Sequence, residues 1–292
     1  MLGLYLNHKC NQHCSFCFNK NSGGEISEVD FGIFLDWVCQ NHPKEISIVG
    51  GEPTMHQHFV RFVQDIRRKV RVPVQVISNL VCEEEKLAGF HHCKVLANAS
   101  TPLSDEDRAV FEKNLEAVVA APGTRVCLSY TLHDLEQDEE RIVQYCREFS
   151  IVSVRIEFAR ASAQRTNKFV TLDSIDPFKD KLLRVARTLT EADVAVNFDC
   201  AMPMDLFSKE EIESARIRRI HLVDPRTNVC LNVCVNADLT ISACPFRVID
   251  DRRLDQFKDL DALFTTVMSE LQKKIEGGEK GPVLCMAERF RT

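Results

Sequence analysis

The alternation of apolar and polar positions along the chain predicts short strands separated by amphipathic helices. Strand-like runs rich in Val, Ile and Leu are predicted at 3–7, 45–50, 74–80, 94–100, 125–132, 153–160 and 194–199. Helical periodicity is predicted between them, at 29–41, 57–70, 83–90, 104–120, 138–149 and 172–190. The helix at 104–120 opens with Ser104-Asp105-Glu106-Asp107, a pattern typical of a capping box.

Strands that alternate with helices indicate βαβ units and a parallel sheet. Six such units over residues 1–199 predict a fold of the α/β class, a partial (β/α)6 barrel. A complete (β/α)8 barrel closes on itself, whereas a shorter one leaves an open side through which a substrate can enter.

The pattern changes after Asp199. Residues 229–244 read as a β-hairpin with a turn at Asn236-Ala237-Asp238, and a helix is predicted at 259–276. We therefore expect two domains, a barrel at 1–199 and a small domain at 200–292 built from a β-hairpin and a helix.

Composition and charge indicate which partners and which cellular location to expect. The chain has 292 residues and a net charge of −6, which does not favour binding to a phosphate backbone, so nucleic acid is not expected as a partner. No apolar run approaches the length of a membrane span, and the N-terminus lacks the pattern of a signal peptide. These features predict a cytoplasmic protein, in which the 13 cysteines would stay reduced.

Three of those cysteines lie within eight residues, in the segment Cys10-Asn11-Gln12-His13-Cys14-Ser15-Phe16-Cys17. Each iron of a [4Fe–4S] cluster takes one thiolate, so three cysteines leave one iron open for another ligand. An open position is what separates catalytic from structural metal sites. Zinc is the alternative, with His8 or His13 as a fourth ligand.

The spacing of Cys10, Cys14 and Cys17, with the aromatic Phe16 before the last cysteine, resembles the signature of the radical S-adenosylmethionine (SAM) superfamily. The resemblance implies that SAM chelates the open iron through its amino and carboxylate groups. It also implies that reduction of the cluster cleaves SAM to methionine and a 5′-deoxyadenosyl radical, which abstracts hydrogen from a substrate. The cofactor supplies the chemistry and the protein positions it.

Two further motifs follow the second and third predicted strands, where this family has them. Gly50-Gly51-Glu52-Pro53 resembles the GGEP motif; its glycines would let the backbone approach SAM, and Glu52 would meet the SAM ammonium group. Ser78-Asn79 resembles the polar pair that contacts the ribose and carboxylate of SAM. Taken alone, each motif is also compatible with an ordinary turn.

A second group of cysteines lies in the C-terminal part: Cys200, Cys230, Cys234, Cys244 and Cys285. The segment 230–246 resembles the hairpin of twitch and SPASM domains, although Leu239 stands where those domains usually have glycine. The resemblance implies an auxiliary [4Fe–4S] cluster, and we assign Cys200, Cys230, Cys244 and Cys285 as its ligands. Cys234 could replace Cys200 or Cys285 as a ligand, donate a hydrogen atom to a substrate radical, or pack as a buried thiol. Zinc remains the alternative metal for the group.

The sixth predicted strand carries Arg155 and Glu157 on one face. They are expected either to contact SAM or substrate inside the barrel or to form an exposed ion pair at its rim. The expected function is hydrogen abstraction from a peptide or small metabolite, giving oxidation, epimerisation, cross-linking or rearrangement, with a reducing protein such as flavodoxin or ferredoxin as partner. The competing hypothesis is a non-catalytic iron–sulfur or zinc protein.

Overall fold

A computed structural model describes residues 1–18, 24–162, 166–203, 206–216, 219–223, 233–243 and 248–276. Eight strands run in parallel and lie side by side in the order of the chain. They are β1 (Leu2–Tyr5), β2 (Ile46–Val49), β3 (Val74–Ser78), β4 (Lys94–Asn98), β5 (Arg125–Leu132), β6 (Ser153–Phe158), β7 (Ala195–Pro203) and β8 (Arg219–Val223). The predicted α/β class and partial barrel are confirmed.

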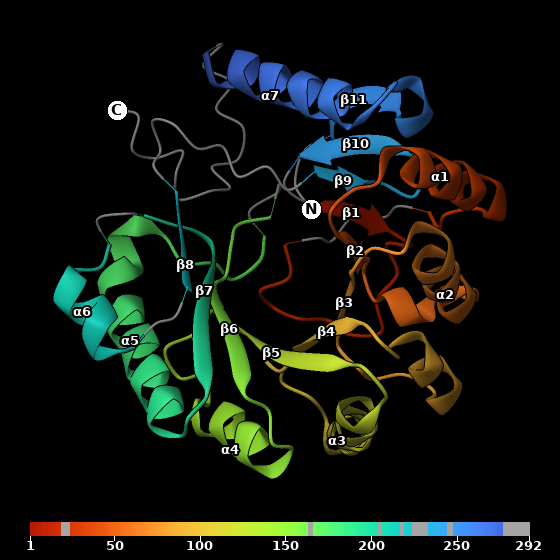
Figure 1. The fold of residues 1–292 in the computed structure, drawn as a ribbon. Coiled ribbons are helices and arrows are strands. Elements are labelled where there is room, and N and C mark those ends of the chain that lie inside the picture. Colours follow the sequence, from red (N-terminus) through yellow and green to blue (C-terminus); the bar gives the residue numbers. More distant parts are fainter. Residues whose placement is uncertain are drawn as a thin grey trace.

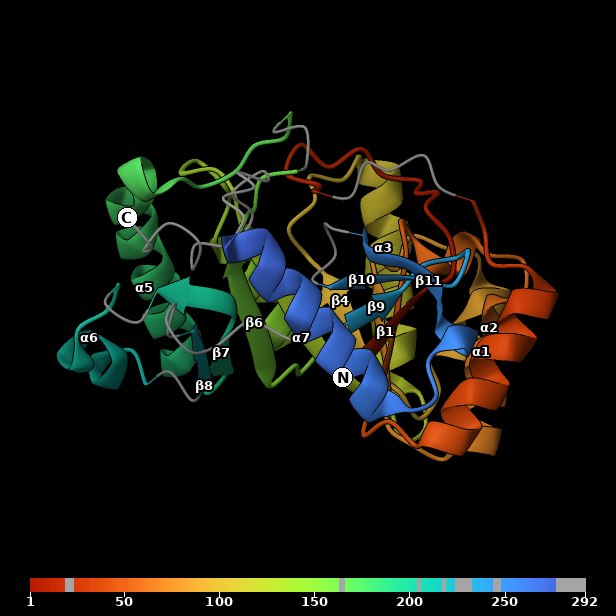
Figure 2. The same ribbon diagram turned by 90° about the horizontal axis from the view of Figure 1, so that it is seen from above.

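Helices cover the outer side of the curved sheet (Figure 1). They are α1 (Glu28–Asn41), α2 (Phe59–Val70), α3 (Asp105–Ala120), α4 (Glu140–Glu148), α5 (Ile175–Glu191) and α6 (Lys209–Ser214). Seen from above, α1 and α2 flank one end of the sheet and α5 and α6 the other (Figure 2). Short 3-10 helices follow β2 (Pro53–Met55) and β3 (Glu84–Gly89), and a third precedes α5 (Leu172–Ser174). The predicted helix at 83–90 is therefore a 3-10 helix.

Each strand has one apolar face and one mixed face. Leu128, Tyr130 and Leu132 of β5 are buried in the core with the helices, whereas Ser129 and Thr131 point to the other side, into the barrel. The same alternation on neighbouring strands turns Ser47, Gln75, Arg155, Glu157 and Asn197 inward. A complete (β/α)8 barrel fills its interior with branched apolar side chains. The polar interior here is suited to a polar ligand.

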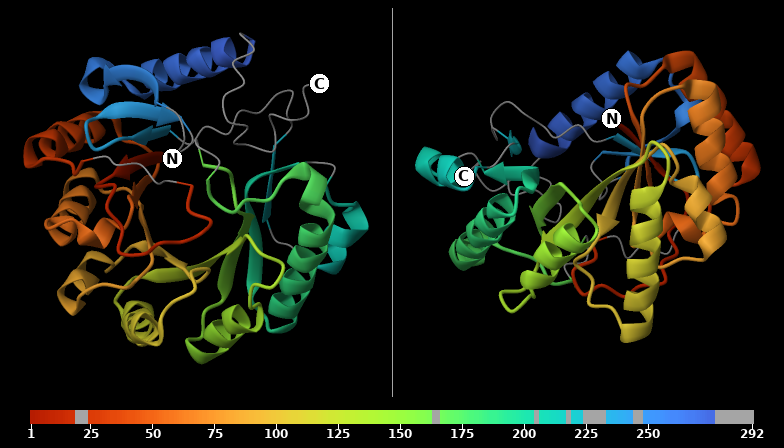
Figure 3. Two further views of the ribbon diagram at one scale, coloured as in Figure 1. Left: turned by 180° about the vertical axis from the view of Figure 1, so that it is seen from behind. Right: turned by 60° about the horizontal axis from the view of Figure 1, so that its bottom comes forward.

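The sheet does not close. It continues past β1 into β9 (Val233–Val235), β10 (Thr240–Ala243) and β11 (Val248–Arg253), so β11 and β8 are its two edges. Because β9 pairs with β1 in parallel, the C-terminal strands extend the barrel wall directly. The 3-10 helix Leu254–Gln256 and helix α7 (Leu260–Glu276) follow, and α7 lies beside β11 (Figures 1 and 3). The expected boundary at 199/200 falls within β7.

Two side-chain contacts fasten these added strands to the first helix. Arg253 at the end of β11 donates to the carboxylate of Asp30 in α1 at 2.7 Å. Trp37 of α1 donates its indole N–H to the carbonyl of Phe257 at 2.8 Å. The Arg253 guanidinium also lowers the pKa of Asp30. The C-terminal strands are therefore held by both the β1 edge and the α1 surface.

The hairpin register differs from the predicted one. The turn is not centred on Asn236-Ala237-Asp238: Asn236 pairs with Thr240, so the loop is Ala237-Asp238-Leu239 and Cys234 lies opposite Ser242. The Asp238 carboxylate accepts hydrogen bonds from the Thr240 N–H and hydroxyl, at 3.0 and 2.6 Å, which fixes the shifted turn. Cys230 and Cys244, which flank the paired part of the hairpin in the sequence, lie outside the described residues.

The backbone conformation of Leu239 explains why similar hairpins usually have glycine at this position. It has φ of 66°, the left-handed conformation expected for the last residue of a three-residue hairpin loop. A side chain in this conformation costs about 1–2 kcal/mol. Leu239 is nevertheless fully buried, so the packing of its side chain offsets the backbone strain.

Within the described residues, no helix is long and apolar enough to cross a lipid bilayer.

Leu239→Gly and Leu239→Ala should both destabilise the protein, because each removes a buried leucine side chain. The Gly variant should be the more stable of the two by about 1 kcal/mol, since only Ala retains the strain of the positive φ. Urea unfolding of both variants measures the difference. At exposed Ala117 in α3 the order should reverse, with Ala117→Gly costing about 1 kcal/mol. Equal stability of the two Leu239 variants would contradict the strain assignment.

Candidate active site

The loop after β1 carries the three clustered cysteines at the carboxyl end of the parallel strands. Cys10, Cys14 and Cys17 are all half-buried. The Gln12 N–H donates to Cys10 Sγ at 3.4 Å, and Cys14 Sγ lies 3.1 Å from the hydroxyl of Thr101. Burial raises the pKa of the Cys10 thiol to about 11, so a metal must displace a proton to bind there.

The GGEP segment packs directly against this loop. Gly51 donates to the carbonyl of Asn7 at 3.0 Å, and Glu52 N–H donates to the carbonyl of Lys9 at 2.7 Å. A Cβ on Gly51 would lie 2.2 Å from the Lys9 carbonyl oxygen, which no side chain can accommodate. Glycine at this position is therefore required, because it lets the loop that follows β2 approach the loop that follows β1.

Glu52 is buried with 1% exposure and accepts four hydrogen bonds. Its Oε1 accepts from the Thr54 N–H and hydroxyl and from the Ser78 hydroxyl, at 3.1, 2.7 and 2.8 Å. Its Oε2 accepts from the Asn79 N–H at 2.7 Å. Burial raises the pKa of Glu52, against the four donors, which favour the carboxylate. Glu52 therefore fixes Ser78-Asn79 relative to the turn that starts at Pro53.

Asn79 completes the connection to the cysteine loop. Its side-chain N–H donates to Asn11 Oδ1 at 2.8 Å, and Asn11 in turn donates to the carbonyl of Val81 at 2.6 Å. The same Asn79 nitrogen lies 3.9 Å from Cys10 Sγ. The three motifs singled out in the sequence are thus joined by hydrogen bonds at the carboxyl ends of β1, β2 and β3. The sequence did not indicate that Asn11 and Thr101 belong to this site, because a single polar residue in a loop forms no recognisable motif.

Phe16 is buried, and its ring lies 4.4 Å from that of His133, in the loop after β5. Burial lowers the pKa of His133, so a neutral ring against Phe16 is favoured. The packing links the cysteine loop to the opposite part of the barrel wall, and nothing in the local sequence around His133 indicated it.

Arg155 and Glu157 lie inside the barrel rather than in an exposed pair at its rim. Arg155 donates to the Ser129 hydroxyl at 3.0 Å and to Glu157 Oε1 at 3.1 Å. Thr131 donates to the same carboxylate oxygen at 3.2 Å, and Arg160 lies 3.7 Å from Glu157 Oε2. The Glu157 side chain is 6% exposed and that of Arg155 18%. Two guanidinium groups thus lie next to the Glu157 carboxylate.

The second cysteine group is placed only in part. Cys230, Cys244 and Cys285 lie outside the described residues, and Cys200 belongs to strand β7. Cys234 is buried in β9 opposite Gly3 of β1, and a Cβ on Gly3 would lie 2.6 Å from its Sγ. Cys234 thus packs in the β1–β9 ladder. Across the described residues, no three His, Cys, Asp or Glu side chains form a ready-made metal site.

The loop after the first strand of this open α/β barrel carries three thiols. Residues 4–100, which include this loop, match the family model of the radical SAM superfamily. The match confirms the resemblance to this superfamily that the sequence showed, and it does not extend to the segment 230–246, whose likeness to twitch and SPASM domains stays a prediction. No curated protein matches the chain in sequence.

Solved structures agree on the fold. SuiB of Streptococcus suis bound to S-adenosylmethionine matches with a TM-score of 0.65 at 14% identity, over 90% of this chain and 65% of that chain. The present chain thus spans less than two thirds of SuiB. Native anSMEcpe with bound AdoMet and Cp18Cys peptide matches with a TM-score of 0.66 at 12% identity, over 98% and 88% of the two chains. At such identities the likeness establishes the fold alone.

Glu52→Gln should destabilise the protein by about 1–3 kcal/mol, because the amide NH2 would face the N–H and hydroxyl donors that the carboxylate now accepts. Glu84→Gln, at an exposed glutamate paired with Lys113, should leave stability nearly unchanged, because water screens this ion pair. Urea unfolding of both variants checks this. A Glu52 variant as stable as the Glu84 variant would contradict the role of Glu52 in holding the site together.

Proposed function

We propose that the protein is a radical SAM enzyme that cleaves SAM reductively and abstracts hydrogen from a peptide or small-metabolite substrate. The observation that carries the proposal is the buried Glu52 carboxylate, which joins the GGEP turn to Ser78-Asn79 directly beside the three-cysteine loop. An electron carrier or scaffold has no use for such a hydrogen-bonded set of polar groups next to its metal.

The donor set fits a [4Fe–4S] cluster that keeps one iron open. Cys10, Cys14 and Cys17 supply three half-buried thiols from one loop, and those of Cys10 and Cys14 lie beside polar groups. The cluster with bound SAM would supply a 5′-deoxyadenosyl radical. In this proposal Gly50, Gly51 and Pro53 shape the turn that approaches SAM. Glu52 faces its ammonium group and holds the pair that follows β3.

Ser78 and Asn79 are the proposed contacts to the ribose and carboxylate of SAM, and Phe16 packs beside the nucleoside. Glu52 already accepts three donors at Oε1 but one at Oε2. A carboxylate oxygen can accept more than one hydrogen bond, so Oε2 is the atom available to an ammonium group.

The substrate is proposed to enter the open barrel and to contact Arg155 and Glu157. The guanidinium groups of Arg155 and Arg160 beside Glu157 are groups that could bind a carboxylate or similar anionic group of the substrate. SuiB has been described with its precursor peptide SuiA, and anSMEcpe with the Cp18Cys peptide. These relatives make a peptide the first candidate, and a small polar metabolite is the second. Oxidation, epimerisation, cross-linking and rearrangement are the candidate outcomes.

The C-terminal part, 200–292, is proposed to act as a twitch/SPASM-like domain that binds an auxiliary [4Fe–4S] cluster. Its ligands would be Cys200, Cys230, Cys244 and Cys285, and a reducing protein such as flavodoxin or ferredoxin would supply electrons. Cys234 is proposed as a hydrogen-atom donor only if substrate reaches the barrel face that Cys234 shares with Gly3 and Tyr5. A cytoplasmic location would keep these thiols reduced.

Replacing Cys10, Cys14 and Cys17 together by Ala should abolish formation of 5′-deoxyadenosine from SAM by the reduced, anaerobic protein. The variant should still hold about four of the eight irons expected for two clusters. Chromatography of the products and iron analysis measure both quantities. Zinc in place of iron in the wild-type protein, or SAM cleavage by the variant, would overturn the proposal in favour of a non-catalytic metal protein.

Cys244→Ala should lose the auxiliary cluster, whereas Cys234→Ala should keep about eight irons. The reason is that Cys234 is buried in β9 and packs against Gly3 of β1, which favours a role in packing over one as a ligand. Iron content of the two variants, prepared side by side, decides the assignment. Loss of iron from Cys234→Ala together with retention in Cys244→Ala would show that the ligand set is wrong.

A further inference from the structure

The backbone between Cys14 and Cys17 is held by residues more than 150 positions away in the chain. Lys168 N–H donates to the carbonyl of Ser15 at 2.8 Å. The side-chain amide of Asn167 donates to the carbonyl of Phe16 at 3.0 Å. Both residues follow β6, on the opposite part of the barrel wall from β1. The loop therefore has a second attachment, separate from the Glu52 contacts.

The orientation of the Asn167 amide is fixed by its neighbours. Its nitrogen faces the carbonyls of Phe16, Arg160 and Lys168, at 3.0, 2.7 and 3.2 Å. Its oxygen accepts from the Ser162 N–H at 2.7 Å. Because backbone carbonyls only accept and a backbone N–H only donates, the reversed amide would lose all of these bonds. Asn167 is 7% exposed, so water does not replace them.

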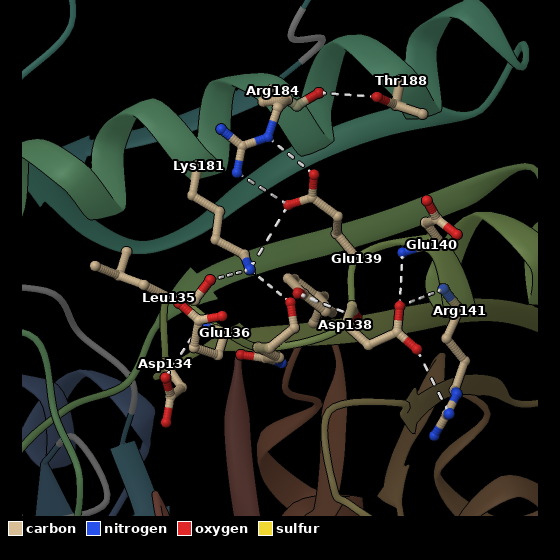
Figure 4. A network of polar contacts seen from close by, with 12 residues as sticks. Asp134, Leu135, Glu136, Asp138, Glu139, Glu140, Arg141, Lys181, Arg184 and Thr188 are labelled. Atoms are coloured by element: carbon tan, nitrogen blue, oxygen red, sulfur yellow. Dashed lines mark hydrogen bonds and ion pairs between the residues drawn. The ribbon is translucent and has the colours of Figure 1, made fainter.

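The segment that carries Asn167 is itself anchored to the loop after β5. The Lys168 ammonium pairs with Asp134, and His133, next to Asp134, packs on Phe16. Figure 4 shows how that loop is held from α5. The buried Lys181 donates to the carbonyls of Leu135 and Gln137, at 2.6 and 2.5 Å. A continuous set of contacts thus runs from helix α5 to the cysteine loop.

We propose that Asn167 is a positioning residue for the metal-binding loop, which it holds to the β6 side of the barrel through the Phe16 carbonyl. The inference rests on the proposed function of that loop. Glu52 and Asn79 hold the loop from the β2 and β3 side, and Asn167 holds it from the other side. The spacing of Cys14 and Cys17 then depends on both walls of the barrel.

Asn167→Asp tests this with the change of a single group, because it turns a donor toward three carbonyl oxygens into an acceptor. Asn114→Asp is the matched control: Asn114 is equally buried and donates to the carbonyls of Leu80 and Cys82, both at 2.8 Å. In the metal-free full-length protein, alkylation is measured by mass spectrometry on two tryptic peptides. Peptide 10–20 carries Cys10, Cys14 and Cys17, and peptide 72–86 carries Cys82.

Asn167→Asp should speed alkylation of peptide 10–20 about tenfold, the factor that one lost buried hydrogen bond produces in a local opening equilibrium, and leave peptide 72–86 unchanged. Asn114→Asp should do the reverse. An unchanged rate in peptide 10–20, or equal acceleration of both peptides by both variants, would overturn the proposal in favour of a general structural role. If Asn167→Asp does not fold, Asn167→Ser removes the same donor without adding a charge and should give the same selectivity.

In the reconstituted wild-type protein, the irons lost in the Cys10, Cys14 and Cys17 triple Ala variant identify the loop cluster. A chelator should remove those irons about tenfold faster from Asn167→Asp than from wild type, and the remaining irons at an unchanged rate. Equal release rates would contradict the positioning role. Wild-type protein that takes up no iron at the loop would instead contradict the proposed function, and the alkylation measurement would still decide the role of Asn167.

Discussion

A carboxylate that is taken out of water without partners costs several kcal/mol, so a buried glutamate either finds donors or is neutralised. Glu52 finds four, and each comes from a backbone or side-chain group whose position matters for the site. The same residue donates its backbone N–H to Lys9, at the entrance to the cysteine loop. One buried charge thus sets the relative positions of the loops that follow β1, β2 and β3.

The contacts of Asn167 hold the cysteine loop from the side of the barrel opposite Glu52. A loop held at one side can pivot, whereas a loop held from two walls of a barrel keeps its shape. Binding sites retain their geometry when the side chains that support them are themselves fixed by packing and hydrogen bonds. Asn167 is fixed by Ser162 and Arg160, and Lys181 fixes the neighbouring loop. The segment with Cys10, Cys14 and Cys17 is therefore held from two parts of the barrel wall, although it is itself a loop.

The open sheet connects this site to the C-terminal strands. Because β9 pairs with β1, the strand that leads into the cysteine loop is an interior strand of the sheet rather than an edge. Covering the β1 edge protects its backbone from unwanted pairing. It also places the C-terminal strands beside the site, and Asp30 and Trp37 of α1 keep them there.

The sequence by itself determined the local features. Apolar periodicity predicted α1 to α5 and β1 to β7, because alternating and helical patterns report directly which side of an element is buried. The spacing of Cys10, Cys14 and Cys17 and the GGEP segment predicted the site, since both are contiguous motifs. Strand β8 and the exact hairpin register were not predicted, and the register shifted because Asp238 fixes a turn one residue later.

Only the tertiary structure decided which distant groups meet. Asn167 and Phe16 are 151 positions apart, and β9 joins β1 across almost the whole chain. Neither contact can be predicted from the local sequence, because a single asparagine or a short apolar run is compatible with many partners. The burial of Arg155 and Glu157 inside the barrel was likewise decided by the way the open sheet curves around them. These contacts arise when the strands assemble, and they convert a set of short motifs into one site.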